Sequence, residues 1–166
     1  RAIVPVAVNL SVAQFQHGDL VERIQRIVRE GGLEPGYIEL ELTESMLMES
    51  AIDHGDVLTR LNTAGFRLAL DDFGTGYSSL SRLKLLPMHS LKIDQSFVRD
   101  IASDPDDRSI VSATAALAHA MGLKVVAEGV EQPGQLAFIQ SLQCEEYQGY
   151  LFSPPLPPAE VERFLG

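Results

Sequence analysis

Residues 68–79 have the sequence LALDDFGTGYSS, and this stretch decides how the rest of the chain is interpreted. Its apolar start predicts a short buried strand, and Asp71 and Asp72 lie where that strand is expected to end. A loop with two glycines follows, and then a serine pair that could cap a helix. Adjacent carboxylates repel each other, so directing both into one pocket is costly unless a cation lies between them. For the pair taken alone, a solvated Asp-Asp turn is the alternative.

The composition predicts a single acidic globular domain. The chain has 166 residues, 45% of them hydrophobic, with a net charge of -10 and a pI of about 4.7. This charge disfavours broad contact with a nucleic acid polymer or an anionic membrane, and it suits a carboxylate site for divalent cations. Cys144 is the only cysteine, which excludes an intrachain disulfide and favours a reducing, cytoplasmic compartment. No run of about 18 apolar residues is present, so no membrane-spanning segment is expected.

Strand and helix patterns alternate along the whole chain. Short apolar runs predict strands at residues 4–8, 37–42, 66–70, 90–94, 123–127 and 146–152. Helices are expected at residues 12–30 with an interruption near Gly18, and at 51–64, 79–86, 97–102, 108–121, 133–142 and 159–165. Such alternation favours a parallel sheet with helices outside it, and near-continuous apolar strands are expected for a sheet covered on both faces.

A polar residue lies at the end of every expected strand, which favours a (β/α)8 TIM-type barrel over an open doubly wound sheet. An open sheet binds its ligand mainly at one switch point, whereas a barrel gathers side chains from all strand ends at one mouth. Six strands are about two βα units short of the eight-stranded barrel, which needs about 250 residues. The residues at the strand ends are Asn9, Glu41, Asp71, Asp72, Lys92, Asp94, Glu128 and Gln148.

These strand-end side chains predict a site for hard divalent cations. Carboxylate and amide oxygens suit Mg²⁺ or Mn²⁺. Asp71 could bridge two ions about 3.5–4 Å apart, an arrangement that hydrolyses phosphodiesters, with Asp72 as a ligand on one side. Lys92 could orient an attacking hydroxide or stabilise the charge that develops on a phosphate. Each residue alone is more often structural than functional, so the argument for function depends on their shared position.

Six motifs follow one another along almost the whole chain. They are NLS (9–11), ELTES (41–45), DDFGTGYSS (71–79), LKID (91–94), VAEGVE (126–131) and QGY (148–150). Together they resemble the motif series of EAL domains, which are bacterial phosphodiesterases of cyclic di-GMP. The resemblance implies a barrel fold, two Mg²⁺ or Mn²⁺ ions, and hydrolysis of one phosphodiester bond of cyclic di-GMP to linear 5′-pGpG.

The resemblance also implies a set of metal ligands. Asn9, Glu41 and Asp71 match ligands of the first ion. Asp71 also matches the bridge to the second ion, with Asp72 and Glu128 beside it. The expected chemistry is in-line attack by a metal-bound hydroxide.

Roles near the substrate follow from the same motifs. Lys92 matches the residue that positions the nucleophilic water, and Glu128 matches the proposed general base. Asp72, Glu131 and Gln148 match residues around the second ion, its waters and the substrate. Outside this group, Glu44 matches a carboxylate that anchors the loop after Asp72. That loop, residues 73–79, matches a segment that couples dimerisation to activity in the family, so a homodimer is expected.

One departure from the family pattern concerns the start of the chain. The Glu-Ala-Leu signature and the nearby phosphate-binding Arg are absent from these 166 residues. Residues 1–166 are therefore expected to be one EAL-type domain that lacks about the first two βα units, within a protein that could carry sensory or membrane domains. Two alternatives stay open: an inactive module that binds cyclic di-GMP or dimerises, and a lyase that uses Lys92 as a Schiff-base nucleophile.

Overall fold

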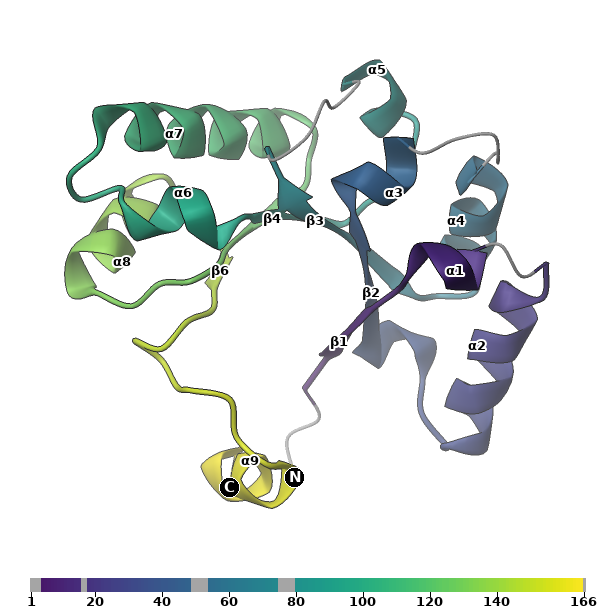
Figure 1. The fold of residues 1–166 in the computed structure, drawn as a ribbon. Coiled ribbons are helices and arrows are strands. Elements are labelled where there is room, and N and C mark those ends of the chain that lie inside the picture. Colours follow the sequence, from purple (N-terminus) through teal and green to yellow (C-terminus); the bar gives the residue numbers. More distant parts are fainter. Residues whose placement is uncertain (1–3, 16–17, 49–53, 75–79, 166) are drawn as a thin grey trace.

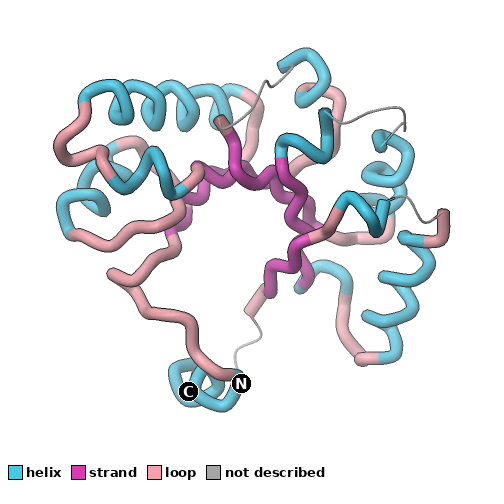
Figure 2. The backbone as a smooth tube through the Cα atoms, in the orientation of Figure 1, coloured by secondary structure: helices cyan, strands magenta, loops and turns pink. Residues whose placement is uncertain are grey.

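A computed structural model describes residues 4–15, 18–48, 54–74 and 80–165. These residues form one sheet in which every strand is parallel to its neighbour, and the strand order follows the chain. The strands are β1 (Val6–Asn9), β2 (Ile38–Thr43), β3 (Arg67–Phe73), β4 (Ser90–Ile93), β5 (Lys124–Ala127) and β6 (Glu146–Tyr147). Figure 2 shows that the strands follow an arc with the helices outside it, and β1 and β6 form the two edges of the described sheet. The curved parallel sheet confirms the predicted barrel-type α/β fold.

Helices follow the strands in the chain, and most lie on the convex side of the arc, whereas α9 (Pro158–Leu165) lies at the opening between β6 and β1 (Figure 1). Those before β4 are α1 (Val12–Phe15), α2 (Leu20–Glu30), the 3₁₀ helix η1 (Pro35–Tyr37), α3 (Glu44–Met48), α4 (His54–Thr63) and α5 (Leu80–Leu83). Those after β4 are α6 (Gln95–Arg99), α7 (Pro105–Ala120), α8 (Pro133–Ser141) and α9 (Pro158–Leu165). Aspartate caps begin two of them, because the Asp94 carboxylate accepts a hydrogen bond from the Ser96 amide and the Asp104 carboxylate accepts one from the Asp106 amide.

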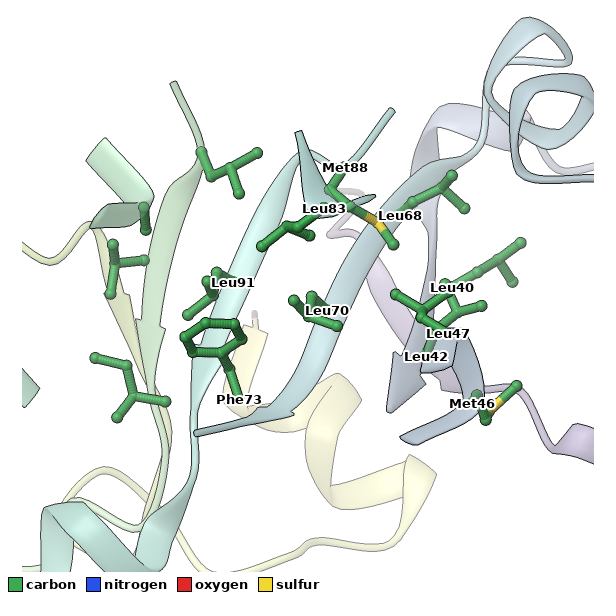
Figure 3. Packing of buried hydrophobic residues seen from close by; sticks show 14 of the residues in the cluster. Leu40, Leu42, Met46, Leu47, Leu68, Leu70, Phe73, Leu83, Met88 and Leu91 are labelled. Atoms are coloured by element: carbon green, nitrogen blue, oxygen red, sulfur yellow. The ribbon is translucent and has the colours of Figure 1, made fainter. Parts of the chain in front are cut away.

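The hydrophobic core lies between the sheet and the helices. Leucines on the central strands, labelled in Figure 3, are at most 2% exposed and pack with helix residues such as Leu47 and Leu83. In β2 and β4 these apolar positions alternate with polar ones, namely Glu39, Glu41, Ser90 and Lys92. Neighbouring strand residues point to opposite faces, so the polar set faces the inside of the arc. The expectation of near-continuous apolar strands is therefore wrong for β2 and β4.

Several element boundaries differ from those expected. The interruption expected near Gly18 is present between α1 and α2, but α3 directly follows β2 where no helix was predicted. The last strand is Glu146–Tyr147 rather than 146–152, because the chain turns after Gly149, whose carbonyl accepts hydrogen bonds from the Phe152 and Ser153 amides. The proposed Ser78-Ser79 cap, and residues 75–79 of the predicted regulatory loop, lie outside the described residues.

Candidate active site

The strand register brings four of the predicted residues together at the carboxyl ends of the strands. Glu41 pairs with Ala69, and Leu70 pairs with Leu91. Asp71 and Lys92 therefore lie side by side on the inner face of the sheet, closer than Glu41 to the carboxyl ends of the strands. Lys92 pairs with Val126, and Glu128 follows two residues later at the end of β5. Because these strands are parallel, their carboxyl ends share one edge of the sheet. Glu41, Asp71, Lys92 and Glu128, together with Asp72, are called the acidic ring below.

An irregularity at the end of β3 allows the side chains of two consecutive aspartates to lie at this edge of the sheet. The register between β3 and β4 shifts between Leu70 and Phe73. Asp72 has φ of 54°, in the left-handed region that few non-glycine residues adopt. In a regular strand Asp72 would point away from Asp71. Instead, oxygens of Asp71, Asp72 and Glu128 all lie within 4.8 Å of one another.

Lys92 is the centre of the acidic ring. Its Nζ lies 2.6 Å from Glu41 Oε1, 2.7 Å from Glu128 Oε1 and 3.1 Å from Asp71 Oδ1, and its side chain is 6% exposed. Burial alone would lower the pKa of Lys92, but hydrogen bonds to Glu128 and Glu41 outweigh burial and raise that pKa. Lys92 is therefore a fixed cation at neutral pH. A charged, triply paired amine is a poor nucleophile, which argues against the Schiff-base lyase alternative.

The acidic ring carries more negative charge than Lys92 can balance. Three carboxylates contact the Lys92 ammonium group and Asp72 lies beside two of them, so four carboxylates and one ammonium leave three formal negative charges. Burial, together with the charges of Asp71 and Asp94, raises the pKa of Asp72. Burial also raises the pKa of Glu128, although its ion pair with Lys92 opposes this rise. Clustered carboxylates with raised pKa values and closely spaced oxygens fit the ligand chemistry of Mg²⁺ or Mn²⁺.

Gln148 and Glu131 extend the site beyond the acidic ring. Gln148 Nε2 donates a 2.7 Å hydrogen bond to Glu128 Oε1, the oxygen that also contacts Lys92. Both residues line a cavity of about 410 Å³ together with Gln95 and Tyr150. Glu131 is exposed, and within the described residues no hydrogen bond or ion pair joins its carboxylate to the acidic ring. The cavity thus adjoins the carboxylates and leaves Glu131 accessible from it.

Asn9 and Glu44 occupy different positions relative to the acidic ring. Asn9 ends β1 opposite Glu41 in the strand register, but among the described residues no hydrogen bond joins its exposed side chain to the acidic ring. Glu44 is 2% exposed at the start of α3, and its Oε2 accepts a 3.1 Å hydrogen bond from the Gly74 amide. The predicted loop anchor therefore contacts the first residues after the aspartate pair.

Close packing between the last two strand ends was not apparent from the sequence. A Cβ on Gly149 would lie 2.2 Å from the Val130 carbonyl oxygen, and a Cβ on Gly129 would lie 2.7 Å from the Gln95 Cβ. Gly149 thus allows the segment that carries Gln148 to approach the segment after Glu128, and Gly129 allows that segment to approach α6. Their positions within the VAEGVE and QGY motifs marked these glycines in the sequence. A glycine in a motif does not reveal, however, which part of the backbone it contacts.

A family model described as "EAL domain" matches residues 1–155. The chain belongs to the EAL domain family. It is 46% identical over 160 residues to the cyclic di-GMP phosphodiesterase NbdA of Pseudomonas aeruginosa, covering 96% of this chain and 20% of NbdA. The chain spans about a fifth of the length of the curated relatives it matches first.

Solved EAL structures share the fold. The PaMucR phosphodiesterase in complex with c-di-GMP is 44% identical, with a TM-score of 0.91, and the match covers 95% of this chain and 64% of that one. BlrP1 of Klebsiella pneumoniae, solved with manganese and cyclic di-GMP, is 35% identical, with a TM-score of 0.83 and coverage of 91% and 39%. These matches confirm the family and the fold that the motifs predicted. Among the described residues, no helix is long and apolar enough to cross a membrane.

Proposed function

We propose that this EAL chain contributes to a divalent-metal-dependent phosphodiesterase that hydrolyses cyclic di-GMP to linear 5′-pGpG. The observation that supports this most is the acidic ring, in which carboxylates from three strands surround one buried lysine. The names of NbdA and of the PaMucR complex point to the same substrate. A cytoplasmic homodimer, within a larger protein, is part of the proposal.

Carboxylates of the acidic ring would hold the metal ions. Asp71, Asp72 and Glu128 offer the closely spaced oxygens, and Glu41 and Asn9 lie at neighbouring strand ends. Bound Mg²⁺ or Mn²⁺ supplies Lewis acidity and lowers the pKa of bound water. Six strands are fewer than the eight of a closed barrel, so we also propose that further strands complete this site.

Residues of the chain would position the water and the phosphate. Lys92 presents a fixed positive charge beside Asp71 and Glu128, where it orients a water and stabilises negative charge on a phosphate oxygen. Glu128 accepts the proton of that water at its carboxylate, which lies 2.7 Å from Lys92 Nζ and has a pKa that burial raises. Gln148 holds Glu128 by its amide, and Glu131 faces the adjoining cavity, where it would contact the substrate.

Product analysis tests this proposal directly. This chain, and a longer chain that includes upstream sequence, are each incubated with cyclic di-GMP and Mn²⁺, and 5′-pGpG is measured by chromatography. Asp71→Asn should abolish turnover while leaving the circular dichroism spectrum unchanged. The matched control is Asp106→Asn, on the exposed first turn of α7, which should turn over like the parent chain. Full turnover by Asp71→Asn would refute the metal assignment.

A binding or dimerisation module is the second candidate, because the described strands leave two free sheet edges beside the site. It predicts that the folded chain binds cyclic di-GMP with Ca²⁺ but makes no 5′-pGpG. A longer chain that includes upstream sequence would then restore turnover if the phosphodiesterase proposal is right. Absence of both binding and turnover in that longer chain would refute both candidates.

A further inference from the structure

We propose that Gln135, on α8, is a positioning residue that fixes the segment from Glu128 to Glu131 against α6. Through this segment it sets the geometry of the acidic ring. The inference rests on the proposed function, because it assigns a role towards the same metal site. Gln135 touches none of the ring residues itself.

The side-chain amide of Gln135 makes all of its hydrogen bonds to backbone groups. Its side chain is on the third residue of α8 and is 1% exposed. Oε1 accepts hydrogen bonds from the Glu131 and Gln132 amides at 2.7 and 2.8 Å. Nε2 donates to the Val98 and Arg99 carbonyls at 3.2 and 2.9 Å. A side-chain amide can make four hydrogen bonds, and this one makes all four.

These four bonds join two segments that each carry a ring residue. Val98 and Arg99 end α6, which begins three residues after Lys92. The Glu131 amide lies three residues after Glu128. One side chain thus bonds two carbonyls at the end of one helix and two amides at the start of another. The 2.7 Å contact from Lys92 Nζ to Glu128 Oε1 spans the same pair of segments.

A simple helix cap explains only part of this arrangement. In a capping box the third residue of the helix accepts a hydrogen bond from the N-cap amide, as Gln135 does from Gln132. The bond from Glu131 and the two bonds to α6 go beyond a cap. Gly129 adds to the argument, because a side chain there would collide with Gln95 at the start of α6. The two segments are therefore in direct contact, and the hydrogen bonds of Gln135 fix the position of one segment relative to the other.

Substitution of Gln135 should make the geometry of the acidic ring less fixed without removing any of the proposed metal ligands. Gln135→Glu keeps the two acceptor bonds and loses both donor bonds to α6. Gln135→Met loses all four bonds at similar size, and Gln135→Glu serves as the second variant if Gln135→Met does not fold. Gln140→Glu and Gln140→Met, at an exposed position of the same helix, are the matched controls.

Two measurements test the proposal on folded samples well below their melting temperatures. Free Mn²⁺ is quantified by electron paramagnetic resonance, and Gln135→Glu should weaken Mn²⁺ binding about 10–100-fold, as loss of residues that support metal ligands does. Amide hydrogen exchange of residues 95–99 and 128–132 should be faster in the Gln135 variants than in the Gln140 variants. Mn²⁺ affinity within twofold of the parent chain, in folded Gln135→Glu, would overturn the proposal.

The two proposals fail in different ways. If the parent chain binds no Mn²⁺, the metal site of the proposed function is refuted, and exchange alone decides the role of Gln135. Unchanged exchange at residues 128–132 in both Gln135 variants would then overturn the positioning role. If the parent chain binds Mn²⁺ and Gln135→Glu binds it equally well, only the further inference fails.

Discussion

Removal of the Lys92 ammonium should destabilise the chain strongly, and divalent cations should partly reverse the loss. Lys92→Met keeps the length of the side chain but leaves Glu41, Asp71 and Glu128 together without their cation. The three carboxylates lie 2.6–3.1 Å from Nζ, and all are at most 13% exposed. Breaking a buried ion pair from one side costs about 3–5 kcal/mol. We expect a loss of that size in the free energy of unfolding when EDTA is present.

Mn²⁺ should stabilise Lys92→Met by more than it stabilises the parent chain. A ligand that binds only the folded state adds about 2.7 kcal/mol at a hundredfold excess over its dissociation constant. Without Lys92 the carboxylates repel each other more, so a bound cation relieves a larger unfavourable energy. Urea unfolding followed by circular dichroism, with and without Mn²⁺, measures both effects.

Lys124→Met is the matched control for this experiment. Lys124 also pairs with a carboxylate, at 3.1 Å from Glu146 Oε1, but its side chain is 54% exposed. An exposed pair of this kind is worth about 0–1 kcal/mol. The reasoning is refuted if Lys92→Met is no less stable than Lys124→Met in EDTA, or if Mn²⁺ stabilises Lys92→Met and the parent chain equally.

Two further predictions concern the sheet edge near β6. Gly149→Ala should lower the free energy of unfolding by about 1–3 kcal/mol in a urea titration, because its Cβ collides with the Val130 backbone; Gly134→Ala, in open space, should not destabilise the chain. Burial alone would raise the pKa of Glu145, but hydrogen bonds from the β5 backbone and a neighbouring histidine outweigh burial and lower it. A lowered pKa stabilises the fold above the unfolded value of 4.5, and this stabilisation is lost as the pH falls through the folded value. Melting temperatures should therefore show Glu145→Gln less stable than the parent chain at pH 7 and equal to it near pH 3; a constant difference, or the same pattern in the control Glu146→Gln, would contradict this.

The strand ends were predictable because chemistry and periodicity coincide there. Apolar runs that stop at a polar residue mark the carboxyl ends of parallel strands, which share one edge. Glu41, Asp71, Lys92 and Glu128 could therefore be grouped before any contact was known, and the structure brings all four together. Their chemical roles remain predictions, as does that of Asn9.

Features that depend on three-dimensional approach were not predictable. The register shift that turns Asp72 towards Asp71 needs the neighbouring strand to define it. Helix α3 was missed because a five-residue helix directly after a strand has too few turns to show a helical period. Gln135 was missed because a glutamine near the start of a helix is ordinary until its partners on α6 are seen.

The two faces of this sheet carry different kinds of residue. Leucines on the outer face sustain the fold by packing under the helices, whereas the inner face carries the acidic ring and adds little apolar packing. A substitution of Asp72, at the mouth, changes ligand chemistry without opening a void under the helices. Under the proposed function, a change there would therefore remove hydrolysis and leave the chain folded.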